Sequence, residues 1–177
     1  MDIKFLVKLT SKAWSLTILA LLHQGVPGRI APLLAAAGAN RTALSQSLDH
    51  LVALGLLERN PGHGHPLRPE FRLTPLGQRW SQLADGVLKA APTADHAALL
   101  RRAWTVPVLT VASRPLFFSE IKRDLPMVTD RALSQSLHLL QDHDWMERWV
   151  NIKLHPPRPY YRTRNGGAVV GGLMAAV

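Results

Sequence analysis

A repeat within the chain constrains its fold more than any other feature. The segment 41–48 (RTALSQSL) returns as 130–137 (DRALSQSL), so that six consecutive residues are identical at an offset of 89. Offsets of 89 or 90 align further blocks in the same order: Ala13-Trp14 with Ala103-Trp104, Leu57-Glu58-Arg59 with Met146-Glu147-Arg148, and His65–Pro69 with His155–Pro159. Chance does not easily place matched blocks in one order, so we predict two tandem copies, 1–90 and 91–177.

Each copy shows the same order of helix and strand signals. In the first copy, helices are expected over 14–23 and 30–37 and from about Arg41, where Leu44, Leu48 and Leu51 form one apolar stripe. Strands over 56–59 and 70–73 flank a loop rich in glycine, proline and histidine, and Thr74-Pro75 begins a last helix. This order predicts a winged helix. We therefore expect a mainly α fold with small β-hairpins, in which two tandem winged helix-turn-helix domains form a pseudo-dimer.

The second copy follows the same order with two departures. Helices are expected over 117–125 and 129–141, with an apolar stripe of Leu133, Leu137 and Leu140, and strands over 145–153 and 160–163. Pro107 falls inside the first helix of this copy and predicts a kink there. Asn165-Gly166-Gly167 stands where the first copy has Pro75-Leu76-Gly77, and predicts a degraded last helix. The last helices of the two copies are expected to form a pseudo-twofold interface that buries Trp80, Leu83, Val87 and Leu88.

The charge of the chain indicates a polyanionic partner. Lysine and arginine number 21 against 12 acidic residues, which gives a net charge of +9 and a pI near 10.8. Nucleic acid and an anionic membrane surface both fit this balance. No apolar run reaches the roughly 18 residues of a membrane span, and no signal peptide is evident. We therefore expect a cytoplasmic protein without a membrane partner.

The helix-turn-helix and the wing carry a family resemblance. Residues 116–126 (LFFSEIKRDLP) with 131–137 (RALSQSL) resemble the helix-turn-helix of the HxlR-type winged-helix regulators, and 66–77 (PLRPEFRLTPLG) is similar to the wing of that family. Trp14, followed by Ile18-Leu19, resembles its first helix. Members of the family are usually single-copy proteins that act as homodimeric DNA-binding transcription regulators. The resemblance therefore implies a transcription regulator that binds double-stranded DNA and whose two dimer halves are fused into one chain.

The third helix of each copy is the expected reader of bases. Opposite the leucine stripes lie Thr42, Gln46, Asp49 and Ala53 in the first copy and Arg131, Gln135, His138 and Asp142 in the second. Glutamine pairs with adenine through two hydrogen bonds, whereas arginine reads guanine or holds a phosphate. The basic, proline-rich wings are expected to contact the DNA backbone or the minor groove. The predicted DNA contacts are Arg41, Thr42, Gln46, Arg68, Arg72, Arg131, Gln135, His138, Lys153, Arg158 and Arg162.

The third helices also depart from the family pattern. The family tends to carry lysine or arginine where this chain has Ser47, Asp49, Ser136 and His138. An aspartate that faces phosphates is unfavourable unless it accepts from a cytosine amine. The second copy is therefore expected to carry more of the phosphate attraction. Two alternatives remain open: a ligand-binding or resistance protein that has lost DNA binding, and an enzyme, for example of natural-product biosynthesis, on the same scaffold.

An aromatic small molecule is the second expected partner. Five tryptophans are many for a chain of this length. Two of them fall in the apolar first helices, where core packing is the plainer role, and the others lie near the hairpins and the first copy's last helix. By analogy with winged-helix drug sensors, they are candidates for a flat pocket between the copies. The candidate ligand contacts are Trp14, Trp80, Trp104, Trp145 and Trp149.

Signals for catalysis and metal binding are weak. The absence of cysteine excludes disulfides, cysteine zinc sites, iron–sulfur clusters and a cysteine nucleophile. The sequence has no glycine-rich phosphate loop and no Gly-x-Ser-x-Gly motif, and His63-Gly64-His65 lacks a nearby carboxylate or cysteine that would complete a metal site. No catalytic residue, metal or cofactor is therefore predicted, and the number of chains in the assembly is left open.

Overall fold

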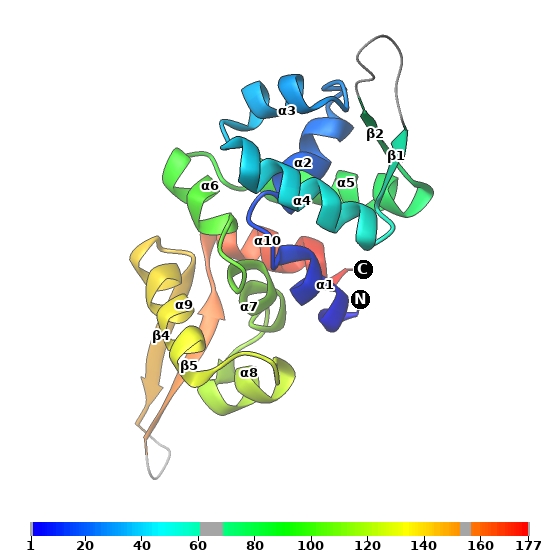
Figure 1. Cartoon of the computed structure of the whole chain (residues 1–177). Helices are drawn as coiled ribbons and strands as arrows, with labels where there is room; N and C mark the ends of the chain where they lie inside the picture. Colours follow the sequence, from blue (N-terminus) through cyan, green and yellow to red (C-terminus); the bar gives the residue numbers. More distant parts are fainter. Residues whose placement is uncertain (1, 61–68, 153–156, 177) are drawn as a thin grey trace. The chain divides into compact units, whose positions relative to one another are not determined.

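The computed structural model describes residues 2–60, 69–152 and 157–176, which form two compact units (Figure 1). The first unit is Lys8–Lys89, and the second is Ala90–Val177 together with Met1–Val7. Helix α1 (Ile3–Thr10) therefore begins in the second unit, where Ile3 and Val7 lie beside Trp104 and Leu125.

The first unit is a winged helix. Its antiparallel hairpin pairs Leu57 with Leu73 at one end and Asn60 with Glu70 at the other, and Arg29 bridges to Glu70 as a minimal third strand. The first helix of the fold packs along the last one. The elements are α2 (Ser15–His23), α3 (Ile30–Ala37), α4 (Arg41–Ala53), β1 (Leu57–Asn60), β2 (Glu70–Leu73) and α5 (Pro75–Lys89).

The second unit repeats this order and completes the sheet. Its three strands lie in the order β3-β5-β4, and all pairings are antiparallel. The two tandem winged helix-turn-helix domains of the predicted fold are thereby confirmed. The elements are α6 (Ala94–Leu100), α7 (Thr105–Val111), β3 (Leu116–Phe117), α8 (Phe118–Asp124), α9 (Asp130–Asp142), β4 (Met146–Asn151), β5 (Arg158–Thr163) and α10 (Asn165–Ala175).

The leucine stripes form the inner faces of both third helices. Leu44, Leu48 and Leu51 on α4 are fully buried, and the buried leucines of α9 are Leu133, Leu137 and Leu140. The helix register predicted from the sequence is therefore right. Ser47 donates to the carbonyl oxygen of Ala43 at 2.9 Å, and its counterpart Ser136 donates to Ala132 at 2.8 Å. Both hydroxyls are thus used within their own helices.

Two expectations about helices in the second unit are wrong. Pro107 does not interrupt a helix, because α7 begins at Thr105 and places the proline in the first turn, where backbone N–H groups have no partner within the helix. The last helix is not degraded either, because α10 runs for 11 residues and buries Val170 and Met174. Its glycines have a packing role that composition does not show.

A close approach of backbone requires a glycine at the same position of each last helix. A Cβ at Gly77 would lie 1.9 Å from the carbonyl oxygen of Leu56, and a Cβ at Gly167 would lie 2.3 Å from that of Trp145. Gly167 is the residue that the repeat aligns with Gly77. The Asn165-Gly166-Gly167 segment therefore keeps the residue on which the packing of the helix depends.

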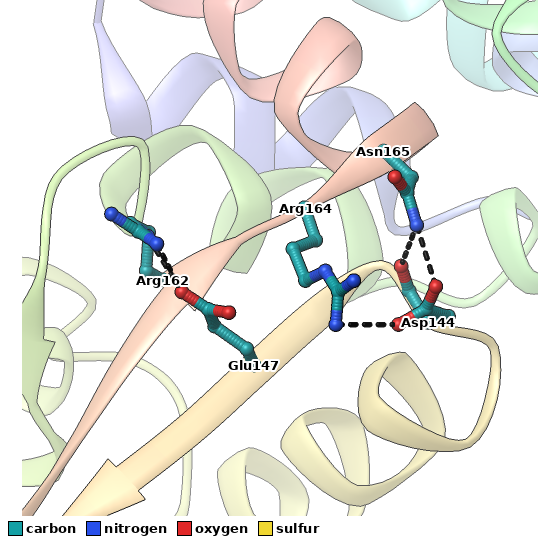
Figure 2. Close-up of polar contacts among 5 residues, drawn as sticks. All are labelled: Asp144, Glu147, Arg162, Arg164 and Asn165. Carbon is teal, nitrogen blue, oxygen red and sulfur yellow. Dashed lines mark hydrogen bonds and ion pairs between the residues drawn. The ribbon is translucent and has the colours of Figure 1, made fainter.

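The end of the third helix is built differently in the two units. Gly55 adopts a φ of +71° after α4, whereas the equivalent Asp144 adopts +56° after α9. Figure 2 shows how the second arrangement is held: Asn165 Nδ2 donates to the Asp144 carbonyl oxygen at 3.1 Å and to its carboxylate at 2.6 Å. Arg164 pairs with the same carboxylate at 3.3 Å. These contacts offset the cost of a left-handed non-glycine residue.

No single helix among the described residues is both long and apolar enough to cross a membrane, and α1 and α2 meet the criteria only as a pair that is bent by 93°.

Candidate nucleic-acid interface

The outer face of α4 carries the polar residues that the sequence predicted there. Arg41, Thr42, Gln46 and Asp49 are all exposed. Asn40 caps the helix by accepting from the Ala43 N–H at 2.8 Å, and Gly38 makes the turn before it at a φ of +64°. The cap fixes the start of the helix, so the guanidinium of Arg41 projects from a defined point beside the turn.

The outer face of α9 repeats this arrangement with different residues. Arg131, Gln135 and His138 are exposed, and Gln135 is the counterpart of Gln46. Thr129 caps the helix by accepting from the Ala132 N–H at 3.2 Å. Lys122 of α8 contacts the Val128 carbonyl oxygen and lies 3.0 Å from the carboxylate of Asp130. The turn before α9 is thereby held in place, and the negative charge at the helix start is partly neutralised.

Two of the predicted wing arginines, Arg72 and Arg162, are exposed but already paired. Arg72 forms an ion pair with Glu70 at 2.8 Å. Arg162 Nε donates to Glu147 at 2.8 Å (Figure 2), and its guanidinium lies 5.5 Å from the ring centre of Trp149. Both arginines therefore contribute less free positive charge than the sequence predicted. Arg68 and Lys153 lie outside the described residues, as do the wing histidines His63, His65 and His155.

A hollow in the first unit brings together two arginines, one of which the sequence analysis missed. Its volume is about 490 Å³, and its lining consists of Arg29, Ile30, Ala31, Pro32, Leu34, Arg41 and Pro69. Arg29 is the extended residue before α3, and neither arginine forms an ion pair with any residue in the described part of the chain. The place where α3, α4 and the wing meet is therefore cationic. Only the fold brings Arg29 close to Arg41, so spacing in the sequence gave no signal for it.

The second unit has a hollow at the corresponding place with a different lining. It has a volume of about 380 Å³ and is lined by Phe117, Phe118, Ser119, Arg158 and Pro159. Pro159 is the counterpart of Pro69 in the repeat, and Phe117 pairs with β5 as Arg29 pairs with β2. Of the residues predicted to contact DNA, Arg158 lies here, and it is exposed.

The tryptophans occupy environments of three kinds. Trp80 and Trp145 are buried, and Trp145 stacks on His96 with ring centres 5.0 Å apart. Trp14 and Trp104 are half-buried, and Trp149 is 37% exposed on β4. Trp104 lines a hollow of about 280 Å³ that also includes Gln135. A candidate ligand residue, Trp104, and a candidate DNA contact, Gln135, therefore line the same hollow. The aromatic pocket expected between the copies stays a prediction.

Asp85 is the buried carboxylate with the most marked electrostatic environment. Lys89 Nζ lies 2.7 Å from one of its oxygens, and Gln24 Nε2 donates to the other at 2.7 Å. The hydrogen bond from Lys89, followed by that from Gln24, holds the pKa of the Asp85 carboxyl below its ordinary value, against the opposing effect of burial. These contacts link α2 to α5, so we assign Asp85 to packing. The described residues contain no group of three or more metal-ligating side chains.

The fold and its two exposed helices define a tandem winged helix-turn-helix protein. The sequence profile of the HxlR-like helix-turn-helix family matches residues 9–91 and again residues 99–177. The chain therefore belongs to the HxlR-like family, whose helix-turn-helix implies a DNA-binding transcription regulator, and it carries the family's domain twice. No curated protein and no solved structure matched the chain.

Proposed function

We propose that the chain binds double-stranded DNA as a single-chain pseudo-dimer and regulates transcription, with α4 and α9 as the two reading helices. The observation that carries this proposal is the repetition of one surface. Gln46 and Gln135 are exposed at equivalent positions above buried leucine stripes, and each lies about one turn from an exposed arginine, Arg41 or Arg131. A helix of this kind presents its N-terminal side chains to base edges in the major groove.

The positive charge that attracts the backbone is concentrated at specific residues. Arg29 and Arg41 line the cationic hollow of the first unit, where α3 and α4 begin. Phosphates approach such helix starts, because backbone N–H groups and arginines both favour an anion there. In the second unit, Arg131 is the second residue of α9 and supplies the positive charge there, while Arg162 is partly neutralised by Glu147. Both units thus contribute cations to a shared duplex.

The exposed acids on the reading helices favour sequence discrimination. Asp49 on α4 and Asp142 on α9 face outward and reduce the attraction to phosphates. A carboxylate can accept from the N4 amine of cytosine, so the cost is reduced where a cytosine lies opposite. The proposal therefore includes modest affinity for random DNA and a bound site that is an imperfect palindrome, because the two helices carry different side chains.

An aromatic small molecule as effector is the second part of the proposal. Trp104 and Gln135 line the same hollow, so a flat ligand against Trp104 would contact the helix that reads DNA. Such contact links ligand binding to DNA binding through one side chain. The test is whether Trp104→Phe changes the effect of an aromatic compound on duplex affinity while leaving the affinity of the free protein unchanged.

Binding to random duplex DNA over a range of salt concentrations tests the first part. A labelled duplex of about 30 base pairs accommodates two half-sites one helical turn apart. We expect saturable binding at low salt that weakens linearly with the logarithm of salt concentration, because counterions are released from the phosphates. Undetectable binding at low salt would favour the ligand-binding or enzyme alternatives over DNA regulation.

A further inference from the structure

Each unit has a row of three neighbouring strand residues at the same place in its sheet, but the side chains of the two rows differ in chemistry. In the first unit Arg29, Glu70 and Asn60 lie side by side in register, because Glu70 pairs with both of the others. In the second unit the same row is Phe117, Tyr160 and Trp149, with Tyr160 in the middle. The row that is polar in the first unit is therefore aromatic in the second.

The aromatic row forms a stacked column. The ring centres of Phe117 and Tyr160 are 4.1 Å apart at an interplanar angle of 28°, and those of Tyr160 and Trp149 are 5.5 Å apart at 18°. Phe117 and Tyr160 are half-buried, and Trp149 is 37% exposed. Packing of the core does not require these rings, because the core side of β5 is occupied by Tyr161 and Thr163. The row presents a rigid aromatic surface at the outer side of the sheet.

The hollow of about 380 Å³ lies at the Phe117 end of this column. Phe117, Phe118 and Pro159 give it apolar walls, while Ser119 and Arg158 supply its polar groups. Arg158 is exposed and forms no ion pair with a residue that the structure describes. Glu120, the nearby acid, is engaged as the acceptor of the Phe117 N–H at 2.8 Å and does not line the hollow. The volume is in the range of small-molecule sites.

We propose that this hollow binds a planar aromatic carboxylate. The ring of the ligand packs against Phe117 and Phe118, and its carboxylate accepts hydrogen bonds from the guanidinium of Arg158. The corresponding hollow of the first unit has Arg29 and Ile30 in place of the two phenylalanines, so it offers no aromatic wall. The proposal adds a second aromatic-ligand site to the hollow beside Trp104 proposed above, names its ligand class, and does not depend on DNA binding.

Calorimetric titration of the whole chain with 2-naphthoate, without DNA, tests the proposal. We expect one saturable site. Arg158→Gln should weaken binding about tenfold or more, as expected for a charge-assisted hydrogen bond. Phe117→Arg, which restores the residue type of the first unit, should weaken it at least as much. The uncharged 2-naphthamide should bind the parent about tenfold more weakly than 2-naphthoate.

Two matched variants control for charge and for the other aromatic hollow. Arg148→Gln removes an exposed arginine of β4 that does not line this hollow, and Trp104→Phe alters the hollow beside Gln135. Arg148→Gln should bind 2-naphthoate as the parent does, and Trp104→Phe should keep the binding that depends on Arg158. Absence of saturable binding, or an equal effect of Arg148→Gln and Arg158→Gln, would overturn the site. If Trp104→Phe abolishes 2-naphthoate binding and Arg158→Gln does not, the proposed site is also overturned, and the ligand binds in the hollow beside Trp104 instead. Because Arg158 is exposed, Arg158→Gln should leave the domain folded, so it still tests the site if Phe117→Arg unfolds the domain.

Discussion

Gly77 and Leu56 are in direct backbone contact: α5 passes so close to the start of β1 that a Cβ on Gly77 would lie 1.9 Å from the Leu56 carbonyl oxygen. Gly77→Ala should therefore destabilise the first unit by about 1–3 kcal/mol or more, since the backbone must move. Gly172→Ala on α10 is the matched control, because a Cβ there meets nothing within 4 Å. It should raise stability by up to about 1 kcal/mol. Thermal unfolding that orders these two variants the other way round would contradict the helix packing.

Leu48 tests the register of the third helix. It is fully buried on α4, whereas its neighbour Asp49 is exposed. Leu48→Ala should lower the free energy of unfolding by about 2–5 kcal/mol, because it leaves a cavity in the core. Asp49→Ala should change it by less than about 0.5 kcal/mol. Urea unfolding measures both, and an unchanged midpoint for Leu48→Ala would show that the register is wrong.

Asp85 should make the folding stability of the first unit depend on pH. The folded-state pKa of Asp85 lies below its ordinary value, so its contribution to stability is fully present above the unfolded-state pKa. That contribution disappears as the pH falls through the folded-state pKa. Asp85→Asn should cost about 1–3 kcal/mol near neutral pH and should flatten the loss of stability in acid. Unfolding curves measured from pH 7 to pH 2 test this, and a parallel acid dependence in parent and variant would refute the assignment.

The repeated surface was predictable from the sequence because it rests on local patterns. The leucines at positions 44, 48 and 51 recur at helical spacing, so the exposed positions of Thr42 and Gln46 follow from the same register. Caps such as Asn40 are local as well. The order of elements could be predicted for the same reason, since several boundaries are marked by a glycine, a proline or a capping residue, as at Gly38, Asn40 and Gly55.

Local patterns gave incomplete information where contacts distant in sequence decide the structure. Gly167 suggests a weak helix by composition, but the approach of α10 to Trp145 requires a glycine there. Arg162 stays a predicted DNA contact, but the strand register places Glu147 opposite it, which no local pattern indicates. Arg29 gave no signal, because only the fold brings it beside Arg41. These three cases depend on tertiary packing rather than on local pattern.

Asp49 should weaken binding to random DNA if α4 enters the major groove. Asp49→Asn removes a charge that phosphates repel, so the affinity for a random duplex should rise by up to about fivefold at low salt. The exposed Asp95 of α6 provides the control, because Asp95→Asn changes the net charge equally outside the reading helices. Anisotropy titrations compare the two variants. An equal gain from both would mean that net charge alone, and not the position of Asp49, governs binding.

In the proposed complex, both third helices of one chain contact the same duplex. The most direct measurement is the salt dependence of duplex affinity for Arg41→Gln, Arg131→Gln and the double variant, with the exposed Arg79→Gln on α5 as control. We predict that each single change lowers the slope of log affinity against log salt by about 1, and that the double change lowers it by about 2. Arg79→Gln should leave the slope unchanged. A slope that responds to only one of the two helices, or to neither, would show that one chain does not place both helices on the duplex.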